Sequence, residues 1–204
     1  MIEIMERGGP VMWPLLLCSL VALTAVFERV YFWIREAVTR DQGMLERMIE
    51  LTQKGEFEAA IGAAKGACCA PTRVLRAGLI HRDHGLHEAM EVAASEEIAR
   101  MKSAMAILDT IITMAPLLGI LGTVTGIIQS FDLLGQLQIE DPRGVADGIA
   151  EALITTATGL IIALTALLPF NYFISRIQRE TRRLEQVTTQ FEVVYRKGLE
   201  HAAR

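Results

Sequence analysis

Three long runs of apolar residues divide the chain, and polar stretches separate them. The first run covers 11–34, the second 104–134 and the third 152–174. Each is close to or longer than the ~20 residues with which an α-helix crosses ~30 Å of hydrocarbon. Almost no charged residue interrupts their centres, so the pattern predicts three transmembrane helices.

The first run has markers at both ends. Trp13 and Trp33 lie 20 positions apart, about 30 Å along a helix, which suits aromatic anchors at the two membrane interfaces. Glu28 and Arg29 fall about one turn inside the second interface, within reach of it. A cleaved signal peptide would start with a basic segment, whereas Glu3 and Glu6 precede this run. We therefore expect the run to remain as a span.

Lysine and arginine residues predict how the spans are oriented. Residues 35–103 hold ten of them and those after 175 hold seven, whereas residues 1–10 and 135–150 hold one each. Cytoplasmic segments carry the excess of Lys and Arg. We therefore expect an inner-membrane protein with a periplasmic N-terminus and a cytoplasmic C-terminus.

The segment between the first two spans resembles a small helical insertion. Apolar residues recur there at helical spacing, and turn-forming residues separate the short helices: Gly55, Gly62, Gly66, Pro71 and Gly85. Because charges stop after Asp109, one continuous helix is expected from Leu86 to Leu134. The third span is expected to continue into the tail as an amphipathic helix.

The resulting prediction is an all-α integral membrane protein with two spans that extend into the cytoplasm. Its expected segments are the periplasmic N-terminus and first span (1–34), the cytoplasmic insertion (35–103), the second span (104–134), a periplasmic loop (135–150), the third span (151–174) and a cytoplasmic helix (175–204). Composition agrees, because 51% of the residues are hydrophobic and 22% are charged. The net charge of −4 gives no support to nucleic-acid binding.

Small and hydroxylated residues share one face of the second run and of the third. At 100° per residue, six residues of the second run fall within about 100° of one another: Asp109, Pro116, Gly119, Thr123, Gly126 and Ser130. In the third run, Glu151, Thr155, Thr158 and Thr165 cluster within about 80°, while Thr156 points about 140° away from Glu151.

These stripes fit either helix packing or a polar pore. Small residues such as Gly122 and Gly126 let helix backbones approach each other, which is the packing interpretation. Packing does not account for Glu151, or for Thr123 and Thr156, both about 10–12 Å below the outer surface by helical rise. Hydroxyl groups relay protons but do not ionise near neutral pH, so a proton pathway would need a carboxylate from elsewhere.

Two motifs then carry a resemblance. Residues 115–126 read APLLGILGTVTG, followed by Ser130-Phe131, and residues 148–160 read GIAEALITTATGL, with Asn171 beyond. These motifs resemble the second and third spans of the MotA/TolQ/ExbB proton-channel family, and the three-span topology is most similar to ExbB and TolQ. The family often has proline in the middle of the third span; this chain has Thr165 there and Pro169 one turn later, so any kink is displaced.

The resemblance implies a homopentamer whose second and third spans surround a pore. The pore would hold the single-span helix of an ExbD- or TolR-like subunit, and an aspartate of that helix would carry the proton. Thr123 and Thr156 would face the pore, with Glu151 near its mouth or at a subunit boundary. The assembly would use the proton motive force to energise a TonB-like transducer for outer-membrane transport, or a TolA-like one for envelope maintenance.

Two other classes of function compete with this interpretation. A non-conducting membrane scaffold would use both stripes for packing alone. A metal-dependent enzyme would draw on His81, His84 and His87, which recur every three residues, but Gly85 interrupts them and no open-site motif is present. We therefore predict no enzymatic activity, no cofactor and no metal ligand. Cys18, Cys68 and Cys69 match no zinc spacing and are expected to be free thiols.

Overall fold

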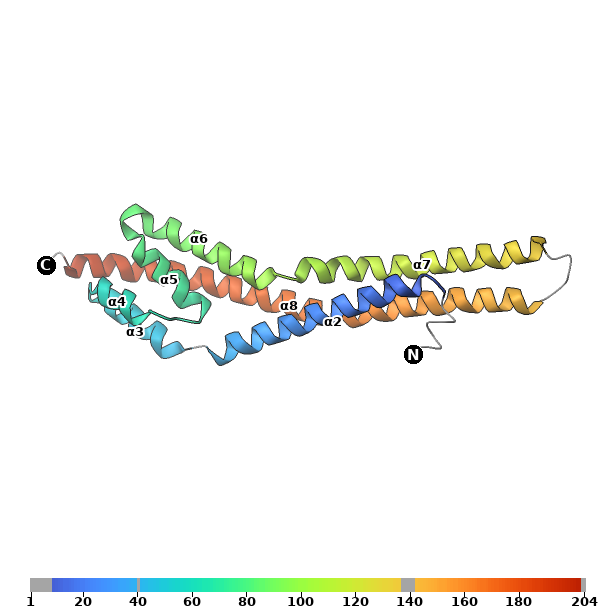
Figure 1. Cartoon of the computed structure of the whole chain (residues 1–204). Helices are drawn as coiled ribbons and strands as arrows, with labels where there is room; N and C mark the ends of the chain where they lie inside the picture. The colour runs from blue at the N-terminus through green and yellow to red at the C-terminus, as the bar shows by residue number, and fades with distance from the viewer. Residues whose placement is uncertain (1–8, 40, 137–141, 203–204) are drawn as a thin grey trace. The chain divides into compact units, whose positions relative to one another are not determined.

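All regular structure in the described part of the chain is α-helical. The computed structural model describes residues 9–39, 41–136 and 142–202 (Figure 1). Its helices are α2 (Met12–Val38), α3 (Gln42–Gln53), α4 (Phe57–Ala63), α5 (Ala70–Ile80), α6 (Arg82–Lys102), α7 (Met105–Gln136) and α8 (Pro142–Ala202). Within these residues three helical segments are long and apolar enough to cross a membrane: Met12–Val38, Arg82–Asp132 and Ala146–Ala202. The predicted all-α class is confirmed.

The third apolar run continues into the tail as predicted. Helix α8 extends from Pro142 to Ala202 without interruption and contains Pro169 in its interior. The polar half of α8 is amphipathic: Ile177, Leu184 and Phe191 are buried, at spacings of seven residues that keep one helical face inward.

The second apolar run does not continue from the preceding helix, so the expected single helix from Leu86 to Leu134 is wrong. Helix α6 ends at Lys102, Ser103 has an extended backbone with ψ 144°, and Ala104 has a left-handed φ of 62°. Arg100 and Lys102 occupy the last turn of α6, where positive charge favours a helix end. A second deviation lies at Gly85, where a φ of 126° interrupts the helical backbone.

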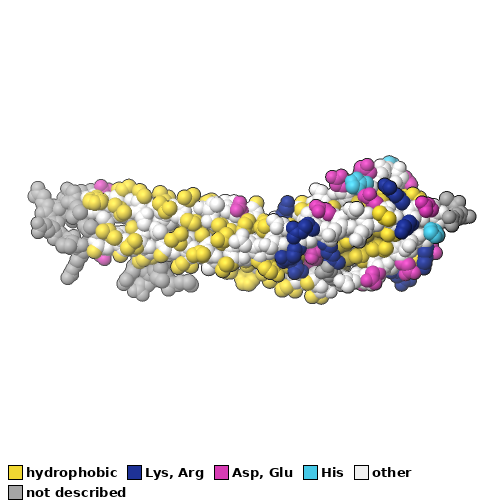
Figure 2. Space-filling model, turned by 180° about the vertical axis from the view of Figure 1, so that it is seen from behind, with side chains coloured by type: hydrophobic (Ala, Val, Ile, Leu, Met, Phe, Trp, Pro, Cys, Tyr) yellow, Lys and Arg dark blue, Asp and Glu magenta, His cyan; other side chains and the backbone are white. Residues whose placement is uncertain are grey.

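The described chain divides into two compact units. The first unit comprises the described residues within 1–29 and 104–173, and the second those within 30–103 and 174–204. In the first unit, large apolar side chains point outward, among them Trp13, Phe27, Leu117, Phe131 and Leu168, and Figure 2 shows hydrophobic side chains spread over its visible face. Such a surface suits lipid or a neighbouring subunit better than water.

The second unit has an ordinary buried core under a charged surface. Met48, Leu75, Leu79, Met90 and Phe191 are among its fully buried side chains. Figure 2 shows Lys, Arg, Asp and Glu side chains gathered on the visible surface of this unit, among hydrophobic and other side chains. This contrast is the one expected between a membrane-embedded unit and one in water.

Helices α3 to α6 form the predicted insertion, and local signals fix their ends. The carboxylate of Asp41 accepts a 3.0 Å hydrogen bond from the backbone N–H of Met44 and so caps α3. Pro71 lies in the first turn of α5, where proline is favoured. Gly55 separates α3 from α4 with a φ of +82°, and Gly66 precedes α5 with a φ of +84°. Gly62, in contrast, lies inside α4.

Candidate functional site

The candidate site lies where α7 and α8 pack against each other in the first unit. A Cβ atom built on Gly119 would lie 3.0 Å from the Cα of Thr156, and one built on Gly126 would lie 3.0 Å from the carbonyl oxygen of Gly148. A Cβ built on Gly159 would meet backbone of α7 more closely still. The glycines thus bring the two helix backbones into direct contact, and Figure 1 shows α7 and α8 side by side. We call this contact at Gly119, Gly126 and Gly159 the seam between α7 and α8.

A hydrogen bond between the two helices crosses this contact. The Thr156 hydroxyl on α8 donates to the carbonyl oxygen of Gly119 on α7, at 2.9 Å. In α-helical geometry the same carbonyl also accepts from the backbone N–H of Thr123, four residues later. The hydroxyl of Thr123 donates to the carbonyl of Ile120 at 2.6 Å. Gly119 therefore links the two threonines that the sequence singled out.

Four of the stripe residues are buried between the helices: Gly119, Gly126, Ser130 and Thr155. Ser130 is 2% exposed and donates to the carbonyl of Gly126 at 2.8 Å. Thr155 is 1% exposed and donates to the carbonyl of Ala152 at 2.8 Å. The hydroxyls of Ser130 and Thr155 are therefore satisfied inside their own helices, and the two glycines allow the close backbone approach, as the packing interpretation expects.

The other candidates are half-buried and keep part of their surface open: Pro116, Thr123, Thr156, Thr158 and Glu151. Thr158 donates to the carbonyl of Ile154 at 2.8 Å within its own helix. A hydroxyl that donates its single hydrogen to a carbonyl still presents oxygen lone pairs as acceptors. These threonines can therefore accept hydrogen bonds from water or from a proton-bearing partner.

Glu151 is set apart from the two linked threonines. Its carboxylate packs against the backbone of Gly9, where any Cβ would clash with it. Thr156 faces α7, so the two residues occupy different faces of α8, as the helical projection predicted. Glu151 directly precedes the uncharged range 152–175, five residues before Thr156.

The middle of this unit contains no group that stores a proton. Residues 110–131 and 152–175 include no Asp, Glu, His, Lys or Arg. The polar side chains in these two ranges are hydroxyls and the amides of Gln129 and Asn171, none of which titrates near neutral pH.

The structure does not gather the three histidines into a metal site. Among the described residues, no group of three or more His, Cys, Asp or Glu side chains is arranged to hold a metal ion. The ring of His87 instead forms an ion pair with Glu192. The three cysteines are free thiols, as expected, with Cys69 buried and Cys68 exposed.

Sequence reasoning missed a charge network in the second unit. Arg73 on α5 donates two hydrogen bonds of 2.7 Å to the carboxylate of Glu97 on α6, and Glu36 on α2 lies 3.9 Å from the same guanidinium. The hydrogen bond from Arg73 to Glu97 is the main reason that the pKa of Arg73 is raised. Glu36 also accepts the backbone N–H of Ala70 at 3.1 Å and so caps α5. Because Arg73 and Glu97 are 24 residues apart, no local sequence pattern indicates that they pair.

Comparison with known proteins identifies relatives over nearly the whole chain. Residues 70–186 match the model of the MotA/TolQ/ExbB proton channel family. "Putative biopolymer transport protein ExbB-like 1" of Synechocystis sp. is 39% identical over 198 residues, which cover 94% of this chain and 77% of that protein. A second Synechocystis protein, "Putative biopolymer transport protein ExbB-like 3", is 33% identical over 93% of this chain and 92% of its own length.

A relative of the other branch matches over a shorter region. The "Tol-Pal system protein TolQ" of Pseudomonas aeruginosa is 36% identical over 110 residues, which cover 54% of this chain and 48% of that protein. The matched part of the family model includes both glycine- and threonine-rich motifs. The range that matches the family model therefore contains the contact between α7 and α8 at Gly119, Gly126 and Gly159.

Proposed function

The chain belongs to the MotA/TolQ/ExbB proton channel family, and from that premise we propose that it forms the channel wall of a proton-driven stator. It would act in the inner membrane with an ExbD-like single-span subunit and energise a TonB-like transducer for outer-membrane transport. The observation that carries this proposal is the hydrogen bond between Thr156 and Gly119, next to Thr123 in a segment without charge.

The chemistry of the seam supports a division of labour between two proteins. Thr123 and Thr156 offer acceptor oxygens on a half-buried surface, so they can hold a water molecule or the O–H of a protonated carboxylic acid. They cannot store the proton. An aspartate of the partner helix would do so, and Glu151 would attract protons at the periplasmic end.

The energetics support a mechanical role. A charged aspartate is costly in an apolar surrounding, and protonation removes that cost. The partner helix would then be free to turn past the threonines and release its proton to the cytoplasm. Each proton that crosses 100 mV supplies about 2.3 kcal/mol, so a few protons suffice for one mechanical step.

The proposed ring size rests on the family resemblance, and the proposed orientation rests on the distribution of Lys and Arg. We propose a homopentamer, the ring size that the family resemblance implies, with the outward apolar side chains of the first unit against lipid or neighbouring copies. The 17 Lys and Arg residues within 35–103 and after 175 favour a cytoplasmic location for both segments. The N-terminus would then be periplasmic.

A TolQ-like role in envelope maintenance is the alternative for the load that the stator drives. The TolQ relative is 36% identical in the region that it matches, close to the identity of the ExbB-like relatives. Both alternatives share the same proton pathway and differ in the TonB-like or TolA-like transducer. The proposed proton pathway therefore does not depend on which transducer is present.

Proton flux into proteoliposomes tests the proposal against a non-conducting scaffold. Vesicles would contain the chain, an ExbD-like partner, both, or both with the partner's intramembrane aspartate changed to asparagine. We expect flux only from the vesicles that hold both wild-type proteins. Flux at the level of empty vesicles in all four samples would contradict the channel role. If the chain alone gave the same flux as the chain with its partner, the partner's aspartate would not be the proton carrier.

A further inference from the structure

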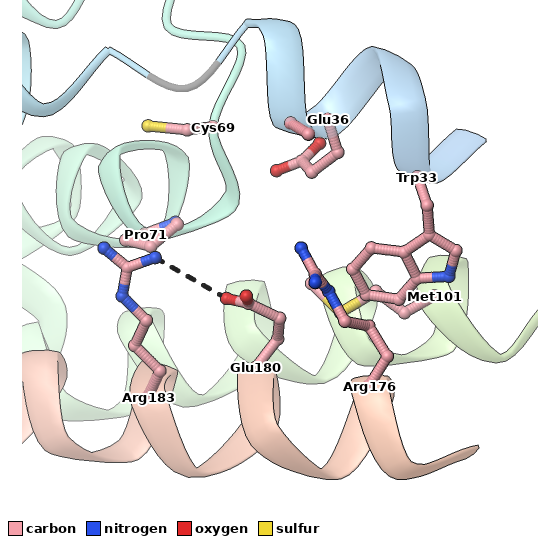
Figure 3. Close-up of a pocket in the computed structure, with 9 residues that line it drawn as sticks. Trp33, Glu36, Cys69, Pro71, Met101, Arg176, Glu180 and Arg183 are labelled. Atoms are coloured by element: carbon pink, nitrogen blue, oxygen red, sulfur yellow. Dashed lines mark ion pairs between the residues drawn. The ribbon is translucent and has the colours of Figure 1, made fainter. Parts of the chain in front are cut away.

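A small pocket of mixed charge lies in the second unit. Trp33 and Glu36 come from the end of α2, and Arg176, Glu180 and Arg183 come from α8 (Figure 3). The cavity has a volume of about 20 Å³, which is enough for one group the size of a water molecule. None of these five residues belongs to the seam between α7 and α8, so the pocket is separate from the proposed proton pathway.

The charged groups of the pocket are only loosely paired with one another. Arg183 and Glu180 are 3.7 Å apart, longer than a hydrogen bond. The guanidinium of Arg176 lies 5.2 Å from the centre of the Trp33 ring, and its buried Nε finds no hydrogen-bond acceptor among the described residues. Figure 3 shows Glu36 and Glu180 approaching the pocket from opposite elements. The pocket therefore offers two cations and two anions with unused hydrogen-bonding capacity.

The sequence places this pocket at the level of lipid headgroups. Trp33 is near the end of the first apolar run, and Arg176 follows the end of the third run at Ile174 by two residues. Met101, which also lines the pocket, precedes the start of the second run by three residues. All three chain segments thus enter the apolar layer at this level, where aromatic and basic residues contact headgroups.

We propose that this pocket binds the headgroup of a phosphatidylethanolamine-type lipid. The primary ammonium enters between the carboxylates of Glu36 and Glu180, and the phosphate lies at the mouth against Arg176 and Arg183. Balanced charge selects a zwitterion, because an anionic headgroup without an amine would bring only negative charge to a pocket that already holds two carboxylates. The small volume selects a primary ammonium over trimethylammonium, which is too large for a space that holds one water-sized group.

Glu36 is held ready for this role by its other contacts. One carboxylate oxygen accepts the backbone N–H of Ala70 at 3.1 Å, and the other lies 3.9 Å from Arg73. These contacts fix the carboxylate without using all of its acceptor sites, because each ionised carboxylate offers about four. A bound ammonium would add one charge-assisted hydrogen bond to an acceptor that is already in position.

Native mass spectrometry of the full-length chain tests the proposal. The purified protein would be mixed with equimolar phosphatidylethanolamine and phosphatidylcholine of identical acyl chains, and the lipid that it retains would be measured. We expect about tenfold preference for phosphatidylethanolamine, as one charge-assisted hydrogen bond provides. E180Q should lose the preference, and R183Q, which removes a contact with the phosphate that both lipids carry, should lower the retention of both. R179Q and R182Q, on exposed positions of the same helix, should keep the wild-type retention and preference.

Two further measurements use the wild-type protein and do not depend on the folding of a variant. Retention should fall with each methyl group added to the lipid amine, and phosphatidylglycerol should be retained less than phosphatidylethanolamine. Equal retention of all headgroups, an unchanged preference in E180Q, or unchanged retention of both lipids in R183Q would overturn the proposal. Retention of soluble phosphoethanolamine at the concentration used for the lipid would overturn the assignment to a membrane lipid.

Discussion

The hydroxyl of Thr156 on α8 donates a 2.9 Å hydrogen bond to the carbonyl of Gly119 on α7. Because Gly119 has no side chain, the Cα of Thr156 comes within 3.0 Å of the position that a Cβ would occupy. Close backbone contact and the hydrogen bond therefore depend on each other. This relationship fixes the depth of Thr156 relative to Thr123, which is one helical turn from Gly119.

Replacing Thr156 should separate proton conduction from assembly. Thr156→Val removes one side-chain hydrogen bond, which costs about 0.5–1.5 kcal/mol of stability, and it should reduce proton flux in the complete stator to background. Thr156→Ser keeps the hydroxyl and should conduct. Thr165→Val is the matched control, since Thr165 is on the same helix and, among the described residues, its hydroxyl donates to the carbonyl of Ile162 within that helix. Wild-type flux in Thr156→Val would remove Thr156 from the pathway.

The glycine seam should be intolerant of even a methyl group. A Cβ on Gly159 would clash with the backbone of Ala115, so Gly159→Ala should destabilise the protein by about 1–3 kcal/mol through overpacking. Gly62 is the control, because among the described residues nothing lies within 4 Å of its added Cβ. Gly62→Ala should stabilise α4 by about 0.5–1 kcal/mol. Thermal unfolding in detergent would measure both, and equal melting temperatures would contradict this account of the seam.

The ion pair between Arg73 and Glu97 should contribute strongly to the stability of the second unit. The side chain of Glu97 is 7% exposed and that of Arg73 is 29% exposed. Glu97→Gln should cost about 1.5–3 kcal/mol, because the partly buried guanidinium loses its charge-assisted hydrogen bonds to Glu97 and keeps only the longer contact with Glu36. Glu50→Gln breaks the exposed pair with Lys54 and should have no measurable effect. Denaturant unfolding of both variants would show the difference, and similar midpoints would refute it.

The ion pair between His87 and Glu192 should respond to pH. The hydrogen bond with Glu192 is the main cause that raises the pKa of His87 above 6.5. Because the folded-state pKa is raised, the stabilisation is fully present below pH 6.5 and is lost as the pH rises through the higher folded value. Glu192→Gln should lower the His87 pKa toward its ordinary value. An NMR titration of the His87 ring would follow this shift, and an unchanged titration would show that the pair does not form.

The sequence alone was sufficient to predict the three long apolar helices and the amphipathic part of α8. Both depend on local apolar patterns, such as the seven-residue spacing of Ile177, Leu184 and Phe191. The break at Ser103 and Ala104 could not be predicted, because alanine is a strong helix former and a single serine without a neighbouring glycine or proline is a weak turn signal. Only the contacts of the folded chain show that one unit ends and the other begins at that point.

The helical projection was less informative about individual hydroxyl groups. Thr155 and Thr156 are neighbours with the same side chain, yet Thr155 is buried and bonds its own helix while Thr156 bonds α7. This difference depends on where Gly119 and Gly122 place the backbone of α7, which a projection of one helix does not contain. The network of Arg73, Glu97 and Glu36 was missed for the same reason, since its members come from three separate helices.

The central claim is that this chain supplies the wall of a pore and that a companion protein supplies the group that carries the proton. The most direct test is a cryo-electron microscopy structure of the chain purified with its single-span partner. We predict a ring with a central cavity that holds the partner helix, with its aspartate at the level of Thr123 and Thr156. A ring without such a cavity, or a partner helix bound only to the outer surface, would contradict the account.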